Sequence, residues 1–243
     1  MLGRKMTLPQ NNVEFLDLLL AKVSGRDAQG ILRLALAEAF PGRTAIISSF
    51  GAESAALLHL VADINPDTPV LFINTSKLFG ETLRYRDRLQ RELGLSDVRA
   101  IGPNGRELAA ADDDECLWSR DADACCTLRK VVPLRRALAA FDAVVTGRKR
   151  FQTGARARMQ PVELFDSRYR FNPLADWSLD HINAYMIRHN LPAHPLTGDG
   201  FTSIGCQPCT RRASPGEGTR SGRWAGLDKE ECGIHIGTDI GLR

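Results

Sequence analysis

The sequence predicts an α/β fold in which a parallel sheet is covered by helices on both faces. Four short apolar runs, at residues 44–49, 69–75, 98–102 and 141–147, have the length and composition of buried strands. Segments with helical spacing separate them, and parallel strands require such crossover connections. With 43% hydrophobic and 25% charged residues in a chain of 243, the composition is that of a globular protein with a sizeable core.

Helical periodicity predicts five helices. Residues 12–23 and 28–40 form a helical preface to the sheet, and residues 55–64 and 80–93 follow the first two strands. The last helix is expected at residues 178–190. From about residue 192 the chain becomes rich in Gly, Pro, Ser and Arg, which predicts an irregular tail. We expect three parts: a helical preface (1–43), an α/β domain (44–205) and a tail (206–243).

The charge and hydropathy patterns narrow the class of protein. No apolar run is long enough to span a bilayer, and the first ten residues lack the apolar core of a secretory signal. We therefore expect a cytoplasmic protein with reduced thiols and no membrane partner. The net charge of +3 does not indicate a nucleic-acid partner, although cations are concentrated in residues 147–158 and 210–223.

Three loops should meet at one edge of the sheet, because such folds bind ligands beyond the carboxyl ends of their strands. They are "SSFGAES" (48–54), "NTSKLF" (74–79) and "TGRKRFQTGAR" (146–156). The first lies between a strand and a helix N-terminus, where free amides attract anions. It lacks the Gly-Lys-Ser/Thr end of a Walker motif, and alone it is equally consistent with a plain turn. The basic loops nearby favour a ligand.

The cysteines indicate a metal or redox-cluster site. Cys125 and Cys126 are adjacent at the start of a predicted helix, and Cys206 and Cys209 form "GCQPC". In a cytosolic chain, two groups of thiols favour metal binding over disulfides, and sulfur ligands suit zinc or iron–sulfur centres. Adjacent helical side chains diverge by about 100°, which is awkward for a zinc knuckle and favours an iron–sulfur cluster. Four buried structural thiols are the alternative.

The other cysteines differ in character. Cys116 has no cysteine partner at motif spacing, and we expect it to be a partly buried structural residue. Lys130 follows Cys126 by one helical turn, so it either leans toward the thiols or is a solvated lysine.

Cys232 stands on a short polar tail beside Lys229 and His235, where its thiol can be exposed. Nearby cations would favour its nucleophilic thiolate, whereas Glu230 and Glu231 would oppose it.

Four motifs together resemble a known family. "CCTLRK", "SIGCQPCTR", "GTRSGRW" and "ECGIH" are similar to those of the assimilatory adenylyl-sulfate reductases, within the sulfonucleotide reductases, and the resemblance covers residues 44–237. It implies a Rossmann-like, nucleotide-binding domain of the adenine nucleotide alpha hydrolase type with a mobile C-terminal tail. It also implies an oxidoreductase that reduces adenosine 5′-phosphosulfate (APS) to sulfite and AMP, in sulfate assimilation and cysteine biosynthesis.

The resemblance also implies roles for individual residues. Cys232 becomes the nucleophile, which forms an S-sulfocysteine that a separate thioredoxin, or a glutaredoxin, releases as sulfite. A [4Fe-4S] cluster is held by Cys125, Cys126, Cys206 and Cys209, with Lys130 between cluster and substrate. The nucleotide is assigned to Ser48, Ser49, Gly51, Thr75, Lys77 and Leu78, the phosphosulfate to Arg156, Arg220, Arg223 and His235, and Gln152 to the substrate.

Two stretches depart from the family pattern, and alternatives stay open. The family's Leu-Asp-Thr-Gly is here "INTS" (73–76), and its "GLRRDQS" is here "GRKRFQT" (147–153). The extra cations would suit 3′-phosphoadenylyl sulfate (PAPS) as substrate instead. An ATP pyrophosphatase is a more distant alternative, since the first loop lacks the second glycine and the aspartate of SGGxDS. A zinc-bound nucleic-acid module is disfavoured by the low net charge. The sequence leaves open whether the chain forms a homo-oligomer.

Overall fold

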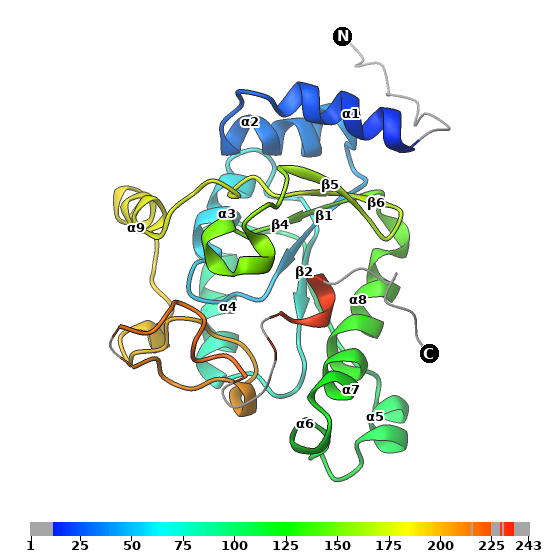
Figure 1. Ribbon diagram of the computed structural model, residues 1–243, viewed down its shortest axis with the longest axis vertical. Helices are drawn as coiled ribbons and strands as arrows, with labels where there is room; N and C mark the ends of the chain where they lie inside the picture. The colour runs from blue at the N-terminus through cyan, green and yellow to red at the C-terminus, as the bar shows by residue number, and fades with distance from the viewer. Residues whose placement is uncertain (1–11, 215, 225–228, 230, 236–243) are drawn as a thin grey trace.

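A six-stranded sheet forms the centre of the protein. The computed structural model describes residues 12–214, 216–224, 229 and 231–235. The strand order is β3-β2-β1-β4-β6-β5 (Figure 1). The strands are β1 (Thr44–Ser48), β2 (Val70–Ile73), β3 (Val98–Ile101), β4 (Ala143–Thr146), β5 (Val162–Phe165) and β6 (Arg168–Phe171). The four predicted strands are thus confirmed. β1 pairs in parallel with β2 and β4, placing Ile46 opposite Val70 and Val145.

The β5–β6 hairpin was not predicted, and it makes the sheet mixed rather than wholly parallel. β6 runs parallel to β4, and β5 adds an antiparallel edge. Asp166 and Ser167 connect the two strands with φ angles of 48° and 62°. A two-residue hairpin loop needs positive φ at both positions, which usually selects Asn-Gly or Asp-Gly. The sequence Asp-Ser carries that signal only weakly.

Helices connect the strands and cover the sheet (Figure 1). The α-helices are α1 (Asn12–Val23), α2 (Ala28–Arg33), α3 (Ser54–Ala62), α4 (Gly80–Glu92), α5 (Gly105–Ala111), α6 (Leu117–Arg120), α7 (Ala122–Cys126), α8 (Val132–Ala137) and α9 (Leu179–Arg188). π-Helical turns at Leu34–Ala39 and Thr127–Val131 extend α2 and join α7 to α8. Within the described residues, no helix is long and apolar enough to cross a bilayer.

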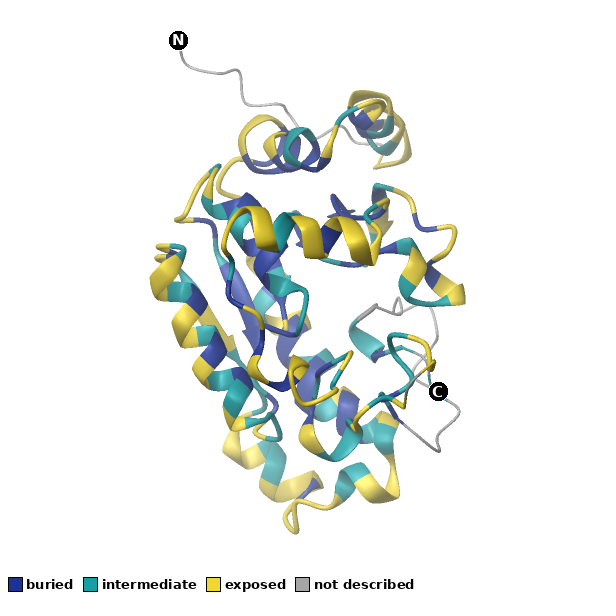
Figure 2. Ribbon diagram, turned by 90° about the vertical axis from the view of Figure 1, so that its left-hand side faces the viewer, coloured by how far each residue is buried: buried dark blue, intermediate teal, exposed yellow. Residues whose placement is uncertain are grey.

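The core has two parts, one on each face of the sheet. Ile46 packs with residues of α1, α2, α3 and α4, whereas its neighbour Ala45 packs on the other face with Leu134 of α8 and Leu71. Alternate residues of one strand thus enter opposite layers, and the strands read as continuous apolar runs for this reason. In Figure 2 the central strands β1, β2 and β4 are mostly buried, and the helices that cover them have buried inner and exposed outer faces.

The predicted irregular segment wraps the carboxyl edge of the sheet. Beyond residue 192, the described residues form only short 3₁₀ turns, at Pro195–Thr197, Gln207–Cys209 and Gly233–His235, and isolated bridges. One bridge joins Leu78 to Cys206, and another joins Thr210 to Arg223. The first places the CxxC motif directly beside the loop that follows β2.

Candidate active site

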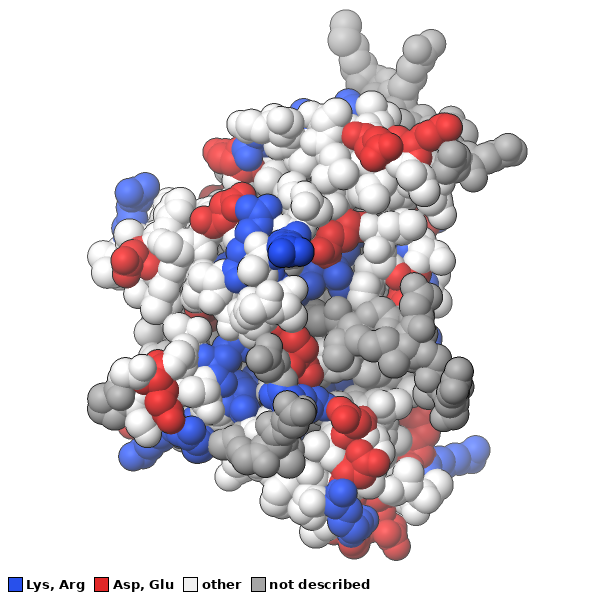
Figure 3. Space-filling model, in the orientation of Figure 1, with Lys and Arg blue, Asp and Glu red and all other residues white. Residues whose placement is uncertain are grey.

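An open pocket lies beyond the carboxyl ends of β1 and β4, with about 930 Å³ of empty space that is partly open to solvent. Its walls come from the loops after these strands and from residues 202–223. On the face shown in Figure 3, lysine and arginine side chains gather around the middle. The lining includes these predicted substrate residues: Ser48, Ser49, Gly51, Gln152, Arg156, Arg220 and Arg223. Two of the three predicted loops therefore meet as expected.

The loop after β1 turns sharply at Phe50. This residue has φ of 49° and is fully buried, and its N–H donates to Ser48 Oγ at 3.1 Å. The left-handed turn brings Ser49 and Gly51 into the pocket wall at the start of α3. A backbone turn before a helix N-terminus is suited to an anionic or polar group of a ligand.

Lys149 and Glu53 also line this pocket, and they were not among the predicted residues. Lys149 is 3% exposed and forms an ion pair with Glu53, whose Oε2 also accepts from Gln152 Nε2 at 2.9 Å. Burial lowers the pKa of Lys149. The only sequence signal was their position, since Glu53 belongs to "SSFGAES" and Lys149 to the basic loop. Their pairing depends on residues 96 positions apart meeting.

Arg148 adds a further buried cation. Its Nη2 donates to Glu163 Oε2 at 2.6 Å, and Arg170 Nη2 donates to the same oxygen at 2.7 Å. Burial and the neighbouring Arg170 guanidinium lower the pKa of Arg148 to about 10. Two guanidiniums thus share one carboxylate, so this corner of the pocket keeps a net positive charge.

Arg156 reaches the tail. Its Nε and Nη2 donate to the two carboxylate oxygens of Glu231 at 2.5 and 2.6 Å. Thr153 Oγ1 donates to Glu231 at 3.1 Å, and Arg220 Nη2 lies 3.8 Å from it. These contacts fasten the residue before Cys232 to the pocket wall.

Arg223 enters the pocket across Gly205. Its guanidinium lies 4.5 Å from the centre of the Trp224 ring and donates to the Ile204 carbonyl at 3.3 Å. A side chain at position 205 would overlap the guanidinium. Gly205 is therefore needed for this close approach.

The four predicted cluster cysteines line a second, narrow cavity. Cys125 and Cys126 come from α7, whose N-cap Asp121 accepts from the amides of residues 123 and 124. Lys77 and Lys130 line the same cavity. Burial raises the pKa of Cys125 and that of Cys209. Within the described part of the chain, no three His, Cys, Asp or Glu residues converge closely enough for one metal ion. The four thiols line a shared cavity and do not converge on the position of a single ion.

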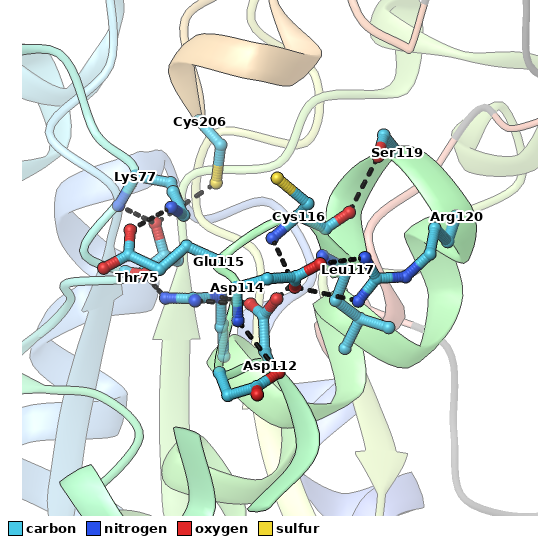
Figure 4. Close-up of polar contacts among 12 residues, drawn as sticks. Thr75, Lys77, Asp112, Asp114, Glu115, Cys116, Leu117, Ser119, Arg120 and Cys206 are labelled. Carbon is cyan, nitrogen blue, oxygen red and sulfur yellow. Dashed lines mark hydrogen bonds and ion pairs between the residues drawn. The ribbon is translucent and has the colours of Figure 1, made fainter. Parts of the chain in front are cut away.

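The loop after β2 faces this second cavity and not the first. Thr75 Oγ1 lies 3.2 Å from Cys206 Sγ, and Leu78 forms the bridge to Cys206. Lys77 Nζ pairs with Glu115 at 2.5 Å (Figure 4). Thr75, Lys77, Leu78 and Lys130 are therefore not part of the pocket wall, although they were predicted to bind substrate.

The turn at Ser76 does need an unusual backbone angle. Its φ is 60°, and Asn74 Oδ1 accepts from the Ser76 N–H at 3.1 Å. The asparagine thus stabilises the left-handed serine that stands where the family has glycine.

Cys232 is buried in this structure, although its position on the tail would allow exposure. Its relative exposure is 8%, and it packs with Cys126 and Trp224. The turn Gly233–His235 that follows Cys232 contacts the π-helical turn Thr127–Val131, which joins α7 to α8 (Figure 1). A hydrogen bond from the Cys126 thiol lowers the pKa of Cys232 well below its ordinary value, against the effect of burial, and Lys130 lowers it further.

Lys130 leans toward the thiols, as one of its two interpretations predicted. Its Nζ lies 3.7 Å from Cys126 Sγ. Burial lowers the pKa of Lys130, but Cys232, Cys206 and Cys126 raise it above its ordinary value.

Cys116 is exposed, and not partly buried as predicted. It lies four residues after Asp112, which pairs with the buried Arg129 at 2.5 Å. Figure 4 shows Asp112 and Cys116 in this segment. The polar run 112–116 turns outward around that pair, so the thiol is left at the surface. The side chain of His235 and all of Glu230 lie outside the described residues.

Comparisons with known proteins agree with this architecture. The phosphoadenosine phosphosulfate reductase domain model matches residues 43–212. The chain is 49% identical, over 80% of each chain, to a protein of Chelativorans sp. (strain BNC1) named adenosine 5′-phosphosulfate reductase. It is 45% identical, over 91% of each, to a protein of the same name from Mesorhizobium japonicum.

This chain belongs to the phosphoadenosine phosphosulfate reductase family. Among solved structures, the phosphoadenylyl-sulfate reductase of Candida auris, in a phosphate complex, is similar with a TM-score of 0.70 and 25% identity. The match covers 85% of this chain and all of that one. The family model ends before Arg220 and Arg223, so part of the wall of the first pocket comes from outside the matched region.

Proposed function

We propose that the protein is an adenylyl-sulfate reductase, an oxidoreductase that converts APS to sulfite and AMP with electrons from a thioredoxin, as a step of sulfate assimilation. The observation that carries this proposal is the position of Cys232. Its thiol packs against Cys126 of the four-thiol cavity, while Ile234, two residues on, lines the cation-rich pocket. The names of the bacterial relatives support APS as the substrate.

The pocket suits a nucleotide that carries two anionic groups. Ser48, Ser49 and Gly51 form a polar wall next to β1, and Arg156, Arg220 and Arg223 line the same pocket. Placed there, the arginines would offset the repulsion between a thiolate and the phosphosulfate, and they would stabilise the charge that develops on departing AMP.

The chemical step is a sulfonyl transfer to Cys232. The thiolate attacks the sulfur of the phosphosulfate, an S–S bond forms, and the bond between that sulfur and the bridging oxygen breaks. The electron pair leaves with AMP. Arg223 and Lys130 lie near the thiol and favour its deprotonated form.

The second step needs an external dithiol. A thioredoxin thiolate, or that of a glutaredoxin, attacks Cys232 Sγ, sulfite departs with the bonding pair, and the second donor thiol resolves the mixed disulfide. Cys232 is 8% exposed, so the tail must leave the position described above before a protein thiol can reach it. The mobility of the tail thus remains a prediction of this scheme.

The second cavity offers four thiols, the ligand set that a [4Fe-4S] cluster requires. The ligands would be Cys125, Cys126, Cys206 and Cys209, which surround a space instead of converging on one centre. When bound, such a cluster would supply an iron–sulfur centre and keep the four sulfurs deprotonated. Lys130, which lines the same cavity, would face that centre, and the family resemblance places it between cluster and substrate.

The direct test is an anaerobic preparation assayed for sulfite release with reduced thioredoxin. We expect a brown protein with about four irons per chain, faster with APS than with PAPS. Cys232→Ser should abolish turnover and leave the visible spectrum intact, whereas Cys206→Ser should lose iron. Sulfite production by Cys232→Ser at the normal rate would exclude the nucleophile assignment. Faster turnover of PAPS would assign the second substrate, for which the extra buried Arg148 provides a reason.

A further inference from the structure

Glu231 occupies a site built for an anion. Its carboxylate accepts hydrogen bonds from Nε and Nη2 of Arg156, at 2.5 and 2.6 Å, and from the Thr153 hydroxyl at 3.1 Å. Arg220 approaches to 3.8 Å from a different loop. A bidentate guanidinium matches carboxylate, phosphate and sulfate groups equally well. The contacts therefore define an oxyanion subsite, here filled by the protein's own side chain.

The subsite belongs to the substrate pocket. Arg156 and Arg220 both line that pocket, and both are assigned above to the phosphosulfate. Arg156 is 6% and Glu231 11% exposed, so the guanidinium would lack a close counter-ion if the carboxylate left and nothing replaced it. Leaving one partner of a buried pair uncompensated is costly, so exchange of one anion for another is the favourable route.

We propose that Glu231 is an internal competitor of the substrate: it fills the Thr153–Arg156–Arg220 subsite when the pocket is empty, and the sulfonate or phosphate group of the substrate displaces it. The inference rests on the proposed function for the identity of the substrate, but not for the exchange itself. Any tetrahedral oxyanion of suitable size should compete.

The exchange also moves the nucleophile. Glu231 is the neighbour of Cys232 in the chain, so its departure from Arg156 pulls on the backbone that holds the thiol against Cys126 and Trp224. Substrate binding would thereby release Cys232 from its buried position. The same contact keeps the thiol covered while no substrate is present.

The first experiment measures APS binding by calorimetry to Cys232→Ser, which cannot turn over, and to Cys232→Ser combined with Glu231→Gln. The amide keeps the shape but is a weaker competitor for Arg156, so we expect APS to bind about tenfold more tightly to the double variant. Adenosine, which carries no anion, should bind both equally. Glu217→Gln is the matched control, because Glu217 pairs with Arg211 on the surface of the same tail. Equal or weaker APS binding to the Glu231 variant would overturn the proposal.

The second experiment uses inorganic pyrophosphate and does not depend on APS. The rate of Cys232 alkylation by iodoacetamide is followed at the peptide level in the full chain, prepared without oxygen. We expect pyrophosphate to accelerate alkylation several-fold in the native protein, and the Glu231→Gln protein to react fast without it. If APS does not bind but pyrophosphate acts in this way, the proposed substrate is wrong and the exchange stands. No effect of pyrophosphate on the native protein would overturn the exchange.

Discussion

The two buried pairs Arg129–Asp112 and Arg156–Glu231 share one chemistry and differ in their surroundings. Arg129 and Asp112 are 2% and 0% exposed, and Arg129 also donates to the Thr75 carbonyl at 2.8 Å. Arg156 and Glu231 are slightly more exposed, and Arg156 lines the large pocket. The first pair is a permanent cross-link between the loop after β2 and the helices that carry the thiols. The second lies where a ligand can replace one partner.

Burial alone therefore does not assign a role to an ion pair. What decides the role is whether another anion can reach the arginine. Arg129, the partner of Asp112, is 2% exposed and lies away from the large pocket, whereas Arg156, the partner of Glu231, lines that pocket. We therefore expect loss of Asp112 to affect mainly folding and loss of Glu231 to affect mainly binding.

The largest effect should follow from breaking the closed pair. Asp112→Ala leaves the Arg129 guanidinium buried without its carboxylate, and we expect the free energy of unfolding to fall by about 3–5 kcal/mol. Chemical denaturation would measure this. The exposed pair of Asp114 and Arg120 in the same segment provides the control, and Asp114→Ala should change stability little. Equal losses in the two variants would contradict the distinction by burial.

The pH dependence of stability should be dominated by a different residue, His194. Its contribution must be separated from those of the Asp112 and Glu231 carboxylates. Burial lowers the pKa of His194 from 6.5 to about 4, and its Nδ1 accepts from the Leu196 N–H at 3.2 Å. The unfolded chain therefore binds a proton at a higher pH than the folded chain, and stability falls as the pH drops from about 6.5 to 4.

We expect this loss to amount to about 2–3 kcal/mol. Denaturation of the native protein and of His194→Gln at several pH values would measure it, and the variant should show a flatter profile in that window. An unchanged profile would assign the loss to other groups.

A smaller effect on stability is expected for the exchangeable pair. Glu231→Gln should lower the free energy of unfolding by about 1 kcal/mol, because the amide retains some hydrogen bonds and the pocket admits water to Arg156. Pyrophosphate should raise the thermal midpoint of both proteins. A loss as large as that of Asp112→Ala would show that the second pair is also a permanent cross-link.

The smallest effect on stability concerns Gly205. A methyl group there would displace the Arg223 guanidinium, which is the end of a flexible side chain, so we expect Gly205→Ala to change the unfolding free energy by less than about 1 kcal/mol. Binding of APS should nevertheless weaken, because Arg223 lines the pocket. Gly218→Ala is the control, since a methyl group at position 218 meets no atom within 4 Å. Unchanged APS affinity in Gly205→Ala would remove Arg223 from the binding site.

Local pattern was sufficient for most of the architecture. The four strands of the parallel part and the helices at residues 12–23, 80–92 and 179–188 follow from runs whose periodicity is a property of neighbouring residues. The thiols at positions 125, 126, 206 and 209 were grouped from their spacing, and the structure brings them to one cavity. The β5–β6 hairpin was missed because its Asp166-Ser167 turn adopts an angle that these residues favour less than glycine does.

By itself, the sequence determined the α/β class, the ligand edge of the sheet and the residues able to carry charge and sulfur there. Only the tertiary structure decided which of them meet. The partners Glu53 and Lys149, or Arg156 and Glu231, are separated by 96 and 75 positions, and no local pattern encodes such a contact. Burial of Cys232 and exposure of Cys116 were likewise decided by what packs against each thiol, because the general tendency of free cysteine to be buried does not tell one position from another.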